Sequence, residues 1–414
     1  MTTNKKLTRR DFLKIAGVAG VGATLAACGT PATTAAPAAA TKAPAGPPLK
    51  VGVLVPTTGI YAVLGESMTE GMKMYFESVG NTAGGRKIEL VTDDEGEKPD
   101  EALKKARKMV EQDQVDLVAG IVSSGVAAAV RGFFDETQSV LIIANAGANA
   151  LTRAAKSKYI FRTSFSNWQP NWPMGAWAYE NVGKKALISV PDYGAGADML
   201  KAFEFAFKAA GGTVVEKQLT PFPNMGDPAP FITQISNAKV DFVYAFYSGA
   251  AATTFVKAYG SFGLAGKLPL VGAGFLVEQD VLPSQGDAAL GVKSGLHWAL
   301  TLDNAVNKKF VDDFKKRTTK EANVFAVQGY DTARLIVDSV NAVQGNTKDK
   351  AKWIEAIGGV SFDGPRGKFK MDPKTNNVVQ SIYARDVKKV GDTLQNVVVK
   401  NFGEIADPGD DSKG

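Results

Sequence analysis

DLVAGIVSSGVAAAV, residues 116–130, has the pattern of a buried strand that passes directly into a helix. The apolar run 115–122 suits a strand that is covered on both faces of a parallel sheet. Ser123 and Ser124 follow it, and Gly125 opens an alanine-rich stretch with helical spacing. Ligands of open α/β sheets bind at the carboxyl ends of strands, where helix N-termini offer free N–H groups. The two serines can therefore cap a helix or hold a ligand, and both interpretations stay open.

Strand-length apolar runs and helical patterns alternate on both sides of this stretch. Strands are expected at residues 49–56, 87–95, 140–145 and 159–163, with helices over 66–79, from Asp100 onward and over 125–134. Alternation of this kind is typical of strands that helices cover on both faces. The first part of the chain therefore predicts a right-handed, doubly wound parallel sheet.

The alternation starts again after residue 172 and repeats features of the first part. Strands are expected at 185–191, 213–219, 240–246 and 268–274, with helices over 197–212, 230–238 and 248–263. VSSGVAAAV (122–130) corresponds to FYSGAAATTF (246–255), and both come after a strand that begins with Val-Asp. VPTTGIYAVLG (55–65) likewise corresponds to VPDYGAGADML (190–200). These correspondences predict two lobes of one topology that face each other, which suits a folded part of about 365 residues.

The rest of the chain supplies helices rather than further parallel strands. Helical patterns cover residues 305–318, 327–343 and 349–357, while GKFKMDP (367–373) and QSIYARDV (380–387) are predicted as a pair of strands. We therefore expect one lobe to comprise 49–166 and 299–371. The other lobe is expected to comprise 167–298 and 372–400, with a tail over 401–414.

The first 48 residues have the composition of a leader and a tether. Arg9 and Arg10 precede a short apolar stretch that resembles a twin-arginine export signal and is too short to span a bilayer. LAAC (25–28) resembles a lipoprotein box, in which Cys28 becomes lipidated. Residues 29–48 are rich in alanine, proline and threonine, as disordered tethers are. We therefore expect an exported protein that a lipid on Cys28 holds to the outer face of the bacterial cell membrane.

Composition argues against several classes of function. The net charge of +6 includes five basic residues and one acid in the first 14 positions, so the expected mature chain carries only +2. Such a charge gives no support to nucleic-acid binding. Cys28 is the single cysteine, so no disulfide can form within the chain.

Catalytic side chains are also scarce. The single histidine, His297, lies among apolar residues and is expected to be structural, so Ser–His and Cys–His sites are nearly excluded. The acidic run TDDEGE (92–97) is expected to be a solvated loop and not a metal site. No phosphate-binding glycine motif follows a predicted strand. We therefore expect neither an enzyme nor a bound metal or cofactor.

The predicted loops contain small, hydroxyl and aromatic residues. Ser124, with the N–H groups of Gly125 and Val126, could hold one oxygen of a carboxylate at the helix start. NAGANA (145–150) would let backbone approach a ligand closely, or would form a tight turn. An apolar pocket could be built from the loop aromatics Tyr61, Trp168, Trp172, Tyr193, Tyr247 and Phe275.

As an ensemble, these motifs resemble the type I periplasmic binding proteins of the branched-chain amino acid transport family, the solute receptors of ABC importers. The matching segments are KVGVLVPTTGIYAVLGESMTEGMKMYFE, DLVAGIVSSG, IIANAGANALT, DFVYAF and VQGYDTARL, within Leu49 to Val399. The resemblance implies an α/β fold of two Rossmann-like lobes with parallel sheets, which a three-crossover hinge joins and which close on a ligand. It also implies a monomer that delivers a small molecule to an ABC permease and ATPase.

The resemblance further implies where a ligand would bind. In amino-acid binders of the family, loops that match Ser124 and the run Ala146, Gly147 and Ala148 hold the carboxylate. A glutamate for the α-ammonium would follow the strand LPLVG, but Gly274 stands at or next to that position and Glu278 comes four residues later. With neighbouring loop positions added, the expected ligand-binding set is Tyr61, Leu64, Ser123, Ser124, Ala146, Gly147, Ala148, Asn149, Trp168, Gln169, Tyr193, Tyr247, Ser248, Gly274 and Phe275.

The carboxylate-binding part of this pattern is present, and the ammonium-binding part is missing. A buried ammonium without a partner would cost several kcal/mol. We therefore expect an aromatic or hydrophobic carboxylate as ligand, and SFSNWQ (164–169) and PDYGAGADML (191–200) also resemble members that bind aromatic acids. Three alternatives stay open: a receptor for branched-chain or other amino acids or amides, a sensor module for a membrane signalling protein, and an exported hydrolase, against which the lack of a catalytic base argues.

Overall fold

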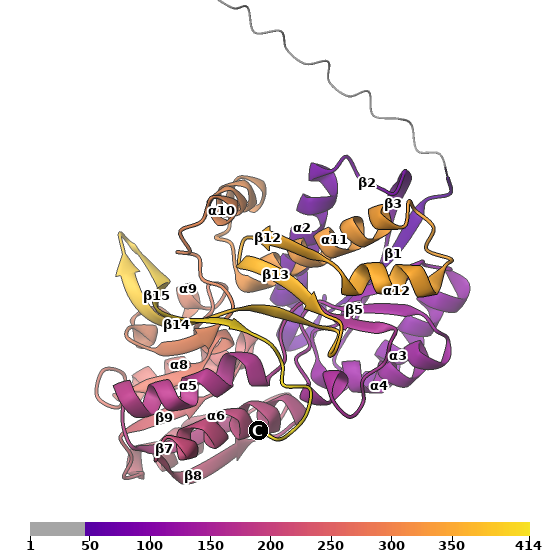
Figure 1. Ribbon diagram of the computed structural model, residues 1–414. Coiled ribbons are helices and arrows are strands. Elements are labelled where there is room, and N and C mark those ends of the chain that lie inside the picture. The colour runs from indigo at the N-terminus through magenta and orange to yellow at the C-terminus, as the bar shows by residue number, and fades with distance from the viewer. Residues whose placement is uncertain (1–45) are drawn as a thin grey trace, which may run out of the picture. The chain divides into compact units, whose positions relative to one another are not determined.

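The computed structural model describes residues 46–414 (Figure 1). The predicted export signal, most of the predicted tether and the predicted lipidation site at Cys28 lie outside the described residues. Within 46–414, no helix combines the length and the apolar character that are needed to cross a bilayer. Strands and helices alternate along the described chain, which places it in the predicted α/β class.

The first sheet is built from the N-terminal part of the chain, in the order β2-β3-β1-β4-β5-β6. Its strands are β1 (Leu49–Val55), β2 (Thr82–Ala83), β3 (Arg86–Asp94), β4 (Leu117–Gly120), β5 (Val140–Ile143) and β6 (Ile160–Arg162), connected by helices that include α2 (Ala62–Ser78), α3 (Pro99–Arg107) and α4 (Ser124–Glu136). All of these strands are parallel except the short edge strand β2. Every residue of β4 and β5 is buried, as expected for strands that helices cover on both faces.

The second sheet repeats this arrangement with five parallel strands, in the order β8-β7-β9-β10-β11. Its strands are β7 (Lys185–Pro191), β8 (Thr213–Thr220), β9 (Phe242–Ala245), β10 (Leu270–Ala273) and β11 (Lys293–Leu296), and the main helices beside them are α5 (Trp168–Asn181), α6 (Gly194–Ala209), α7 (Ala229–Asn237) and α8 (Gly249–Ser261). The prediction of two similar parallel sheets is therefore confirmed.

A single long strand, β14 (Asn377–Val390), joins the two sheets. Asn377 pairs with Arg162 of β6, and residues 383–386 pair antiparallel with β11. β14 also pairs with β13 (Gly367–Asp372) and with β15 (Thr393–Ile405), and β13 pairs with β12 (Ser361–Gly364). The predicted pair of late strands is present, and its second member is longer than predicted because it serves both sheets.

Three longer helices lie between β11 and β12: α10 (Ala305–Thr318), α11 (Val324–Ala342) and α12 (Lys350–Gly358). The short α9 (Leu282–Gln285) precedes them. Helix α11 packs along α2 over the first sheet (Figure 1). It begins three residues before the predicted start because the side chain of Asn323 accepts the N–H of Ala326 and so caps the helix.

Candidate ligand-binding site

A hollow lies where the carboxyl ends of the two sheets meet. Tyr61, Ser124 and Gly147 come after strands of the first sheet, whereas Tyr193 and Ser248 come after strands of the second. The residues that line the hollow are Tyr61, Val122, Ser124, Asn145, Gly147, Phe165, Asn167, Tyr193, Ala195, Met199, Phe246, Ser248 and Phe275. Both sheets therefore contribute to one site at the strand ends, where ligands of open α/β sheets bind.

The structure brings together six residues of the predicted ligand-binding set. The predicted residues in the lining are Tyr61, Ser124, Gly147, Tyr193, Ser248 and Phe275. The other predicted residues lie close to the hollow or in the surrounding core and make contacts of their own.

Ser123 and Ser124 have different roles at the start of α4. Ser123 is the N-cap residue, and its N–H donates to the carboxylate of Glu95 at 2.7 Å. The N–H of Val122 donates to the same carboxylate at 2.7 Å. Ser124 is the first helical residue and lines the hollow, and its side chain is 6 % exposed. Glu95 thus holds the backbone of this loop in place, and Ser124 lines the hollow.

Glu95 is a buried acid that contacts the loop before α4. It was expected in a solvated acidic loop, yet it is only 1 % exposed. Burial raises the pKa of its carboxyl from 4.5 to about 8, although the N–H groups of Val122 and Ser123 oppose that shift. A carboxylate directly after β3 was the available signal, because the ends of neighbouring parallel strands lie together.

The predicted loop 146–149 is held mainly through its backbone. The N–H of Ala146 donates to the carbonyl of Ile121 at 2.9 Å. The carbonyl of Ala148 accepts from the Arg162 guanidinium at 2.7 Å. Asn149 begins a short helical turn, and its side-chain oxygen accepts the N–H of Trp168 at 3.0 Å. These contacts present Gly147 to the hollow, while its neighbours are occupied elsewhere.

Three other predicted residues lie outside the lining. Leu64 is buried in the core beneath α2. The Tyr247 hydroxyl lies 2.8 Å from the hydroxyl of Ser189, inside the core of the second sheet. The carbonyl of Gly274 accepts from the Arg385 guanidinium at 2.9 Å. None of these three lines the hollow.

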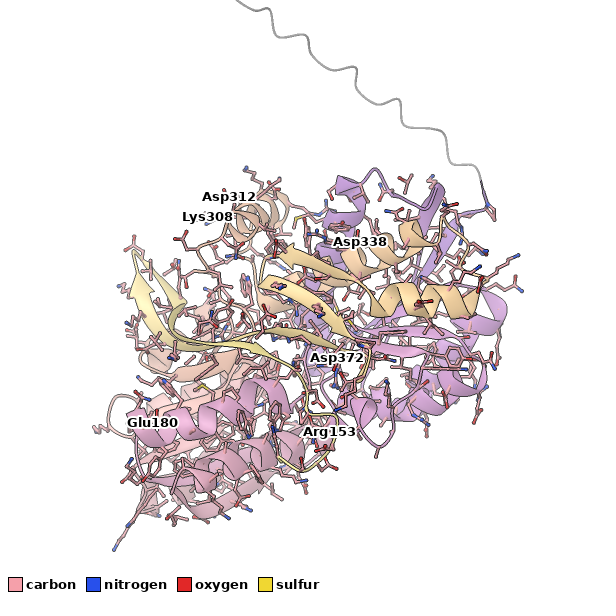
Figure 2. The ribbon with its side chains drawn as sticks, in the orientation of Figure 1. Arg153, Glu180, Lys308, Asp312, Asp338 and Asp372 are labelled. Atoms are coloured by element: carbon pink, nitrogen blue, oxygen red, sulfur yellow. The ribbon has the colours of Figure 1, made fainter. Side chains whose placement is uncertain are left out.

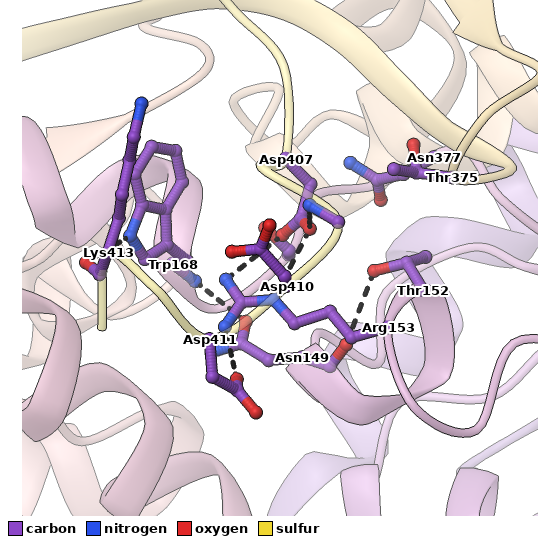
Figure 3. Close-up of polar contacts among 12 residues, drawn as sticks. Asn149, Thr152, Arg153, Trp168, Thr375, Asn377, Asp407, Asp410, Asp411 and Lys413 are labelled. Carbon is purple, nitrogen blue, oxygen red and sulfur yellow. Dashed lines mark hydrogen bonds and ion pairs between the residues drawn. The ribbon is translucent and has the colours of Figure 1, made fainter.

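Trp168 and Gln169 contact the C-terminal segment instead of the hollow. The indole Nε1 of Trp168 donates to the carbonyl of Lys413 at 2.9 Å, and Gln169 donates to the carbonyl of Ile405 at 2.7 Å. Figure 3 shows Trp168 beside Arg153, whose guanidinium contacts carboxylate oxygens of Asp407 at 3.4 Å and Asp411 at 2.6 Å. Residues 401–405 of the predicted tail belong to β15, and the tail contacts the start of α5 through Ile405 and Lys413.

Sequence reasoning missed seven residues of the lining. These are Val122, Asn145, Phe165, Asn167, Ala195, Met199 and Phe246. Each lies within three residues of a predicted position or in the first turns of α6, so proximity in sequence was a usable signal for most of them. Which of two neighbouring residues lines the hollow depends on the direction of each side chain, and the loop conformation sets that direction.

The lining contains no charged side chain. Glu278, the acid considered for an ammonium group, is buried beside Arg385, with 2.8 Å between its oxygen and the guanidinium nitrogen. Its other oxygen accepts the N–H of Val324 at 2.9 Å. Charged side chains such as Glu180, Lys308 and Asp312 are exposed on helices of the outer surface (Figure 2). The hollow is therefore polar through hydroxyl, amide and backbone groups alone.

Aromatic rings form much of the remaining wall. The ring centroid of Phe275 lies 5.0 Å from that of Phe165 and 6.5 Å from that of Phe246. The Tyr61 and Tyr193 hydroxyls lie 3.4 Å apart across the hollow. Burial raises the pKa of Tyr61 to about 12, so its hydroxyl is neutral at ordinary pH. The walls suit a flat apolar body with few polar groups.

A second contact joins the loops of the two sheets beside the hollow. Asp198 of α6 accepts the backbone N–H of Asn149 at 2.8 Å and the side-chain amide of Asn167 at 3.2 Å. Burial raises the pKa of the Asp198 carboxyl, while these two hydrogen bonds lower it. Asp198 and the two tyrosines therefore hold the sides of the hollow together.

The fold and the hollow define a class of protein: an α/β ligand-binding protein with its site between two joined parallel sheets. A family model described as "Periplasmic binding protein" matches residues 48–392. The chain therefore belongs to the periplasmic binding protein family. It is a solute-binding protein of the kind that serves ABC transporters, and not an enzyme. A model of the twin-arginine translocation pathway signal sequence matches residues 6–26, which marks the protein for export to the periplasm.

Similar proteins agree with this assignment. A protein of Brucella melitensis named "Leu/Ile/Val-binding protein homolog 6" is 33% identical over 367 residues, which cover 87% of this chain and 93% of the relative. A solute-binding protein from R. palustris, solved in complex with benzoate, is 37% identical, with a TM-score of 0.80 over 85% of this chain and 96% of that one. Another from Rhodopseudomonas palustris BisB5, solved with 3,4-dihydroxy benzoic acid, is 33% identical, with a TM-score of 0.83 over 87% and 99%.

Proposed function

We propose that the protein binds a small aromatic or hydrophobic carboxylate in the hollow and passes it to an ABC permease. The supporting observation is the lining, which offers aromatic rings, hydroxyls and amides but no charged side chain. An α-ammonium group buried there would lose its hydration without gaining an acid partner. A carboxylate needs only hydrogen-bond donors, and the start of α4 supplies them.

The proposed carboxylate contact is Ser124 with the first turn of α4. The helix has 13 residues, and the N–H groups of its first turn have no carbonyl partner within the helix. A carboxylate there would also be favoured by the helix dipole. Each hydrogen bond to a charged partner contributes roughly 1.5–3 kcal/mol, so two or three account for much of a micromolar affinity of about 8 kcal/mol.

The proposed body of the ligand is a ring held among Tyr61, Tyr193, Phe246 and Phe275. Two solved relatives above 30% identity were obtained with benzoate-type acids, which agrees with this choice. We further propose Gly147 and Ser248 as ligand contacts, because both are in the lining.

We also propose that binding closes two lobes about a hinge. The lobes would comprise 49–166 with 299–371 and 167–298 with 372–400, and the contacts of Tyr61 with Tyr193 and of Asp198 with Asn149 would each join one lobe to the other. The closed form of a monomer would then dock on the permease, which works with an ATPase. A lipid on Cys28 would keep the protein at the membrane, and mass spectrometry of natively purified protein tests that anchor.

Calorimetric titration of the purified protein tests the proposed ligand. Benzoate and 4-hydroxybenzoate are expected to bind with micromolar or tighter affinity, and leucine is expected to give no measurable heat. The Brucella relative's name makes leucine, isoleucine and valine the competing ligands to include. Tight leucine binding with inert benzoates would overturn the proposal and favour an amino-acid receptor.

A further inference from the structure

A row of buried polar side chains leads away from the hollow. Asn145, which lines the hollow, donates through Nδ2 to Oε1 of Gln328 on α11 at 2.7 Å. The Nε2 atom of Gln328 lies 3.3 Å from Nε2 of His297, which directly follows β11. Gln328 and His297 are both fully buried. The row therefore connects a ligand-facing amide to the single histidine of the chain.

In this arrangement the ring proton of His297 has no hydrogen-bond acceptor. If the Gln328 amide NH2 points at His297, Nε2 of the imidazole must accept, and the ring proton must reside on Nδ1. Nδ1 of His297 is buried and has no hydrogen-bond partner among residues 46–414. A buried N–H without an acceptor costs about 1–3 kcal/mol.

Turning both amides over leaves Nδ1 of His297 as an unpaired acceptor instead of an unpaired donor, keeps both hydrogen bonds of Gln328, and moves no heavy atom far. The nitrogen and oxygen of an amide occupy nearly equivalent positions, so the hydrogen-bond network decides which end faces which partner. With the proton on Nε2, His297 donates to the oxygen of Gln328, and the NH2 of Gln328 donates to the oxygen of Asn145. The NH2 of Asn145 then faces the hollow and becomes a donor for a ligand.

We propose that His297 acts through Gln328 to turn the NH2 group of Asn145 into the hollow, where it binds the ligand carboxylate. This inference rests on the proposed carboxylate ligand and adds a donor from the strand next to the Ser124 loop. His297 and Gln328 are positioning residues, because neither lines the hollow. We call the hydrogen-bonded row from His297 through Gln328 to Asn145 the relay. It lets Asn145 donate to an acceptor group of the ligand, and it disfavours a ligand that presents a donor at this point.

Two features of His297 suit this role. Burial first, and then the nearby positive charges of Arg366 and Arg385, lower the pKa of His297 well below its usual value, so the ring is neutral and has a single proton. The ring also stacks on Phe165, with centroids 5.6 Å apart, and Phe165 lines the hollow. The imidazole is thus held in one plane, and only its tautomer stays free.

The single histidine makes the tautomer directly measurable. The full chain labelled with 15N-histidine gives one pair of imidazole nitrogen signals, and a two-bond 1H–15N spectrum identifies the protonated nitrogen. The proton is expected on Nε2 in the free protein and with saturating benzoate. A proton on Nδ1, or a doubly protonated ring, would overturn the relay. If benzoate does not bind, the proposed ligand fails while the tautomer of the free protein is still read.

A double-mutant cycle supplies the functional readout. His297→Phe keeps a ring against Phe165 but removes the donor, and it is expected to weaken benzoate binding about 3- to 10-fold. In a Gln328→Met background, where the relay is already broken, the same change is expected to alter affinity by less than about 2-fold. Equal losses in both backgrounds would contradict coupling through Gln328. If a variant does not fold, the spectrum of the unmodified chain still decides the question.

Discussion

The two sheets are alike at the strand ends away from the hollow and differ at the ends that face it. At the far ends, Asp116 accepts the N–H of Lys50 at 2.9 Å, and Asp241 accepts the N–H of Lys185 at 2.8 Å. In both sheets the aspartate of the Val-Asp pair thus binds the first residues of the neighbouring strand. The shared sequence signal therefore reports a shared structural contact.

At the hollow, the serine loops of the two sheets are supported by different chemistry. Beneath the first loop lies the buried acid Glu95, which binds two N–H groups. Beside the second lies the Tyr247 hydroxyl, which contacts Ser189 and Thr220 at 2.8 and 3.2 Å. The two sheets therefore share the contact at their far ends, while the groups that support their serine loops differ.

The largest effect is expected from Glu95, the buried acid beneath the serine loop of the first sheet. The folded-state pKa of Glu95 is raised from 4.5 to about 8, so the acid favours the folded state at low pH and loses that contribution as pH rises through about 8. Glu95→Gln should abolish this pH dependence of the free energy of unfolding, which is on the order of 4 kcal/mol between pH 4.5 and 9. Urea unfolding across that range measures it.

Tyr247→Phe is the matched change in the second half. This substitution should lower the free energy of unfolding by about 1 kcal/mol at every pH in the same range, because the pKa of Tyr247 is raised to about 12. If the free energy difference between the unmodified chain and Glu95→Gln is also constant with pH, Glu95 is ionised throughout and the contrast between the halves is lost.

The next largest effect tests whether the start of α2 in the first sheet and the start of α6 in the second are equivalent. A Cβ on Gly65 of α2 would lie 1.9 Å from the carbonyl oxygen of Pro56, and a Cβ on Gly196 of α6 would lie 2.0 Å from that of Pro191. Gly65→Ala and Gly196→Ala should each lower the free energy of unfolding by about 3 kcal/mol, because backbone must move. Gly132→Ala, where a Cβ meets nothing within 4 Å, is the control. A large cost at only one glycine would show that the two helix starts are not equivalent.

A smaller effect separates the two serines that line the hollow. Ser124→Ala should weaken benzoate binding by about 30-fold, or about 2 kcal/mol, because it removes a hydrogen bond to a charged group. Ser248→Ala should change the affinity by less than about 3-fold, since the proposed carboxylate lies at α4. Calorimetric titration of both variants provides the comparison. A larger loss at Ser248 would reverse the assignment of the ligand's acid end.

The smallest effect concerns the hydrogen bond between Asp198 and Asn149, which joins the loops of the two sheets. Asp198→Ala removes the acceptor for the N–H of Asn149 and should weaken benzoate binding about 5-fold, through a less stable closed arrangement. Asp192→Ala alters an exposed acid six residues away on the same side and should leave the affinity unchanged. Binding by tryptophan fluorescence at several pH values measures both. Equal affinities for the two variants would show that Asp198 does not contribute to closure.

Much of the fold could be predicted because its signals are local. The apolar runs of β4 and β5 are continuous, and the helix over 305–318 has clear boundaries in the sequence. The double role of β14 could not be predicted, because Asn377 meets β6 while residues 383–386 meet β11, and such distant pairings leave no local pattern.

The candidate site was predictable to the level of its loops. Ser124 and Tyr193 lie within four residues of a strand end, and the rule for strand ends places them at the hollow. Trp168 was expected there for its ring, but its indole donates to the C-terminal segment, which no local signal connects to it. Glu95 was overlooked because an acidic run usually indicates solvent, although its position directly after β3 was a signal that it lies at the strand ends.

The shared strand β14 has a consequence for how the protein denatures. Neither sheet can lose its order alone, because the backbone groups of β14 that pair with the lost sheet would be left without partners. The register of β14 against β15 shifts between Ser381 and Arg385, at the passage from one sheet to the other. The same strand that pairs with both sheets thus carries an irregularity in its pairing between them. Heating should therefore give a single cooperative calorimetric peak, even though the chain contains two sheets.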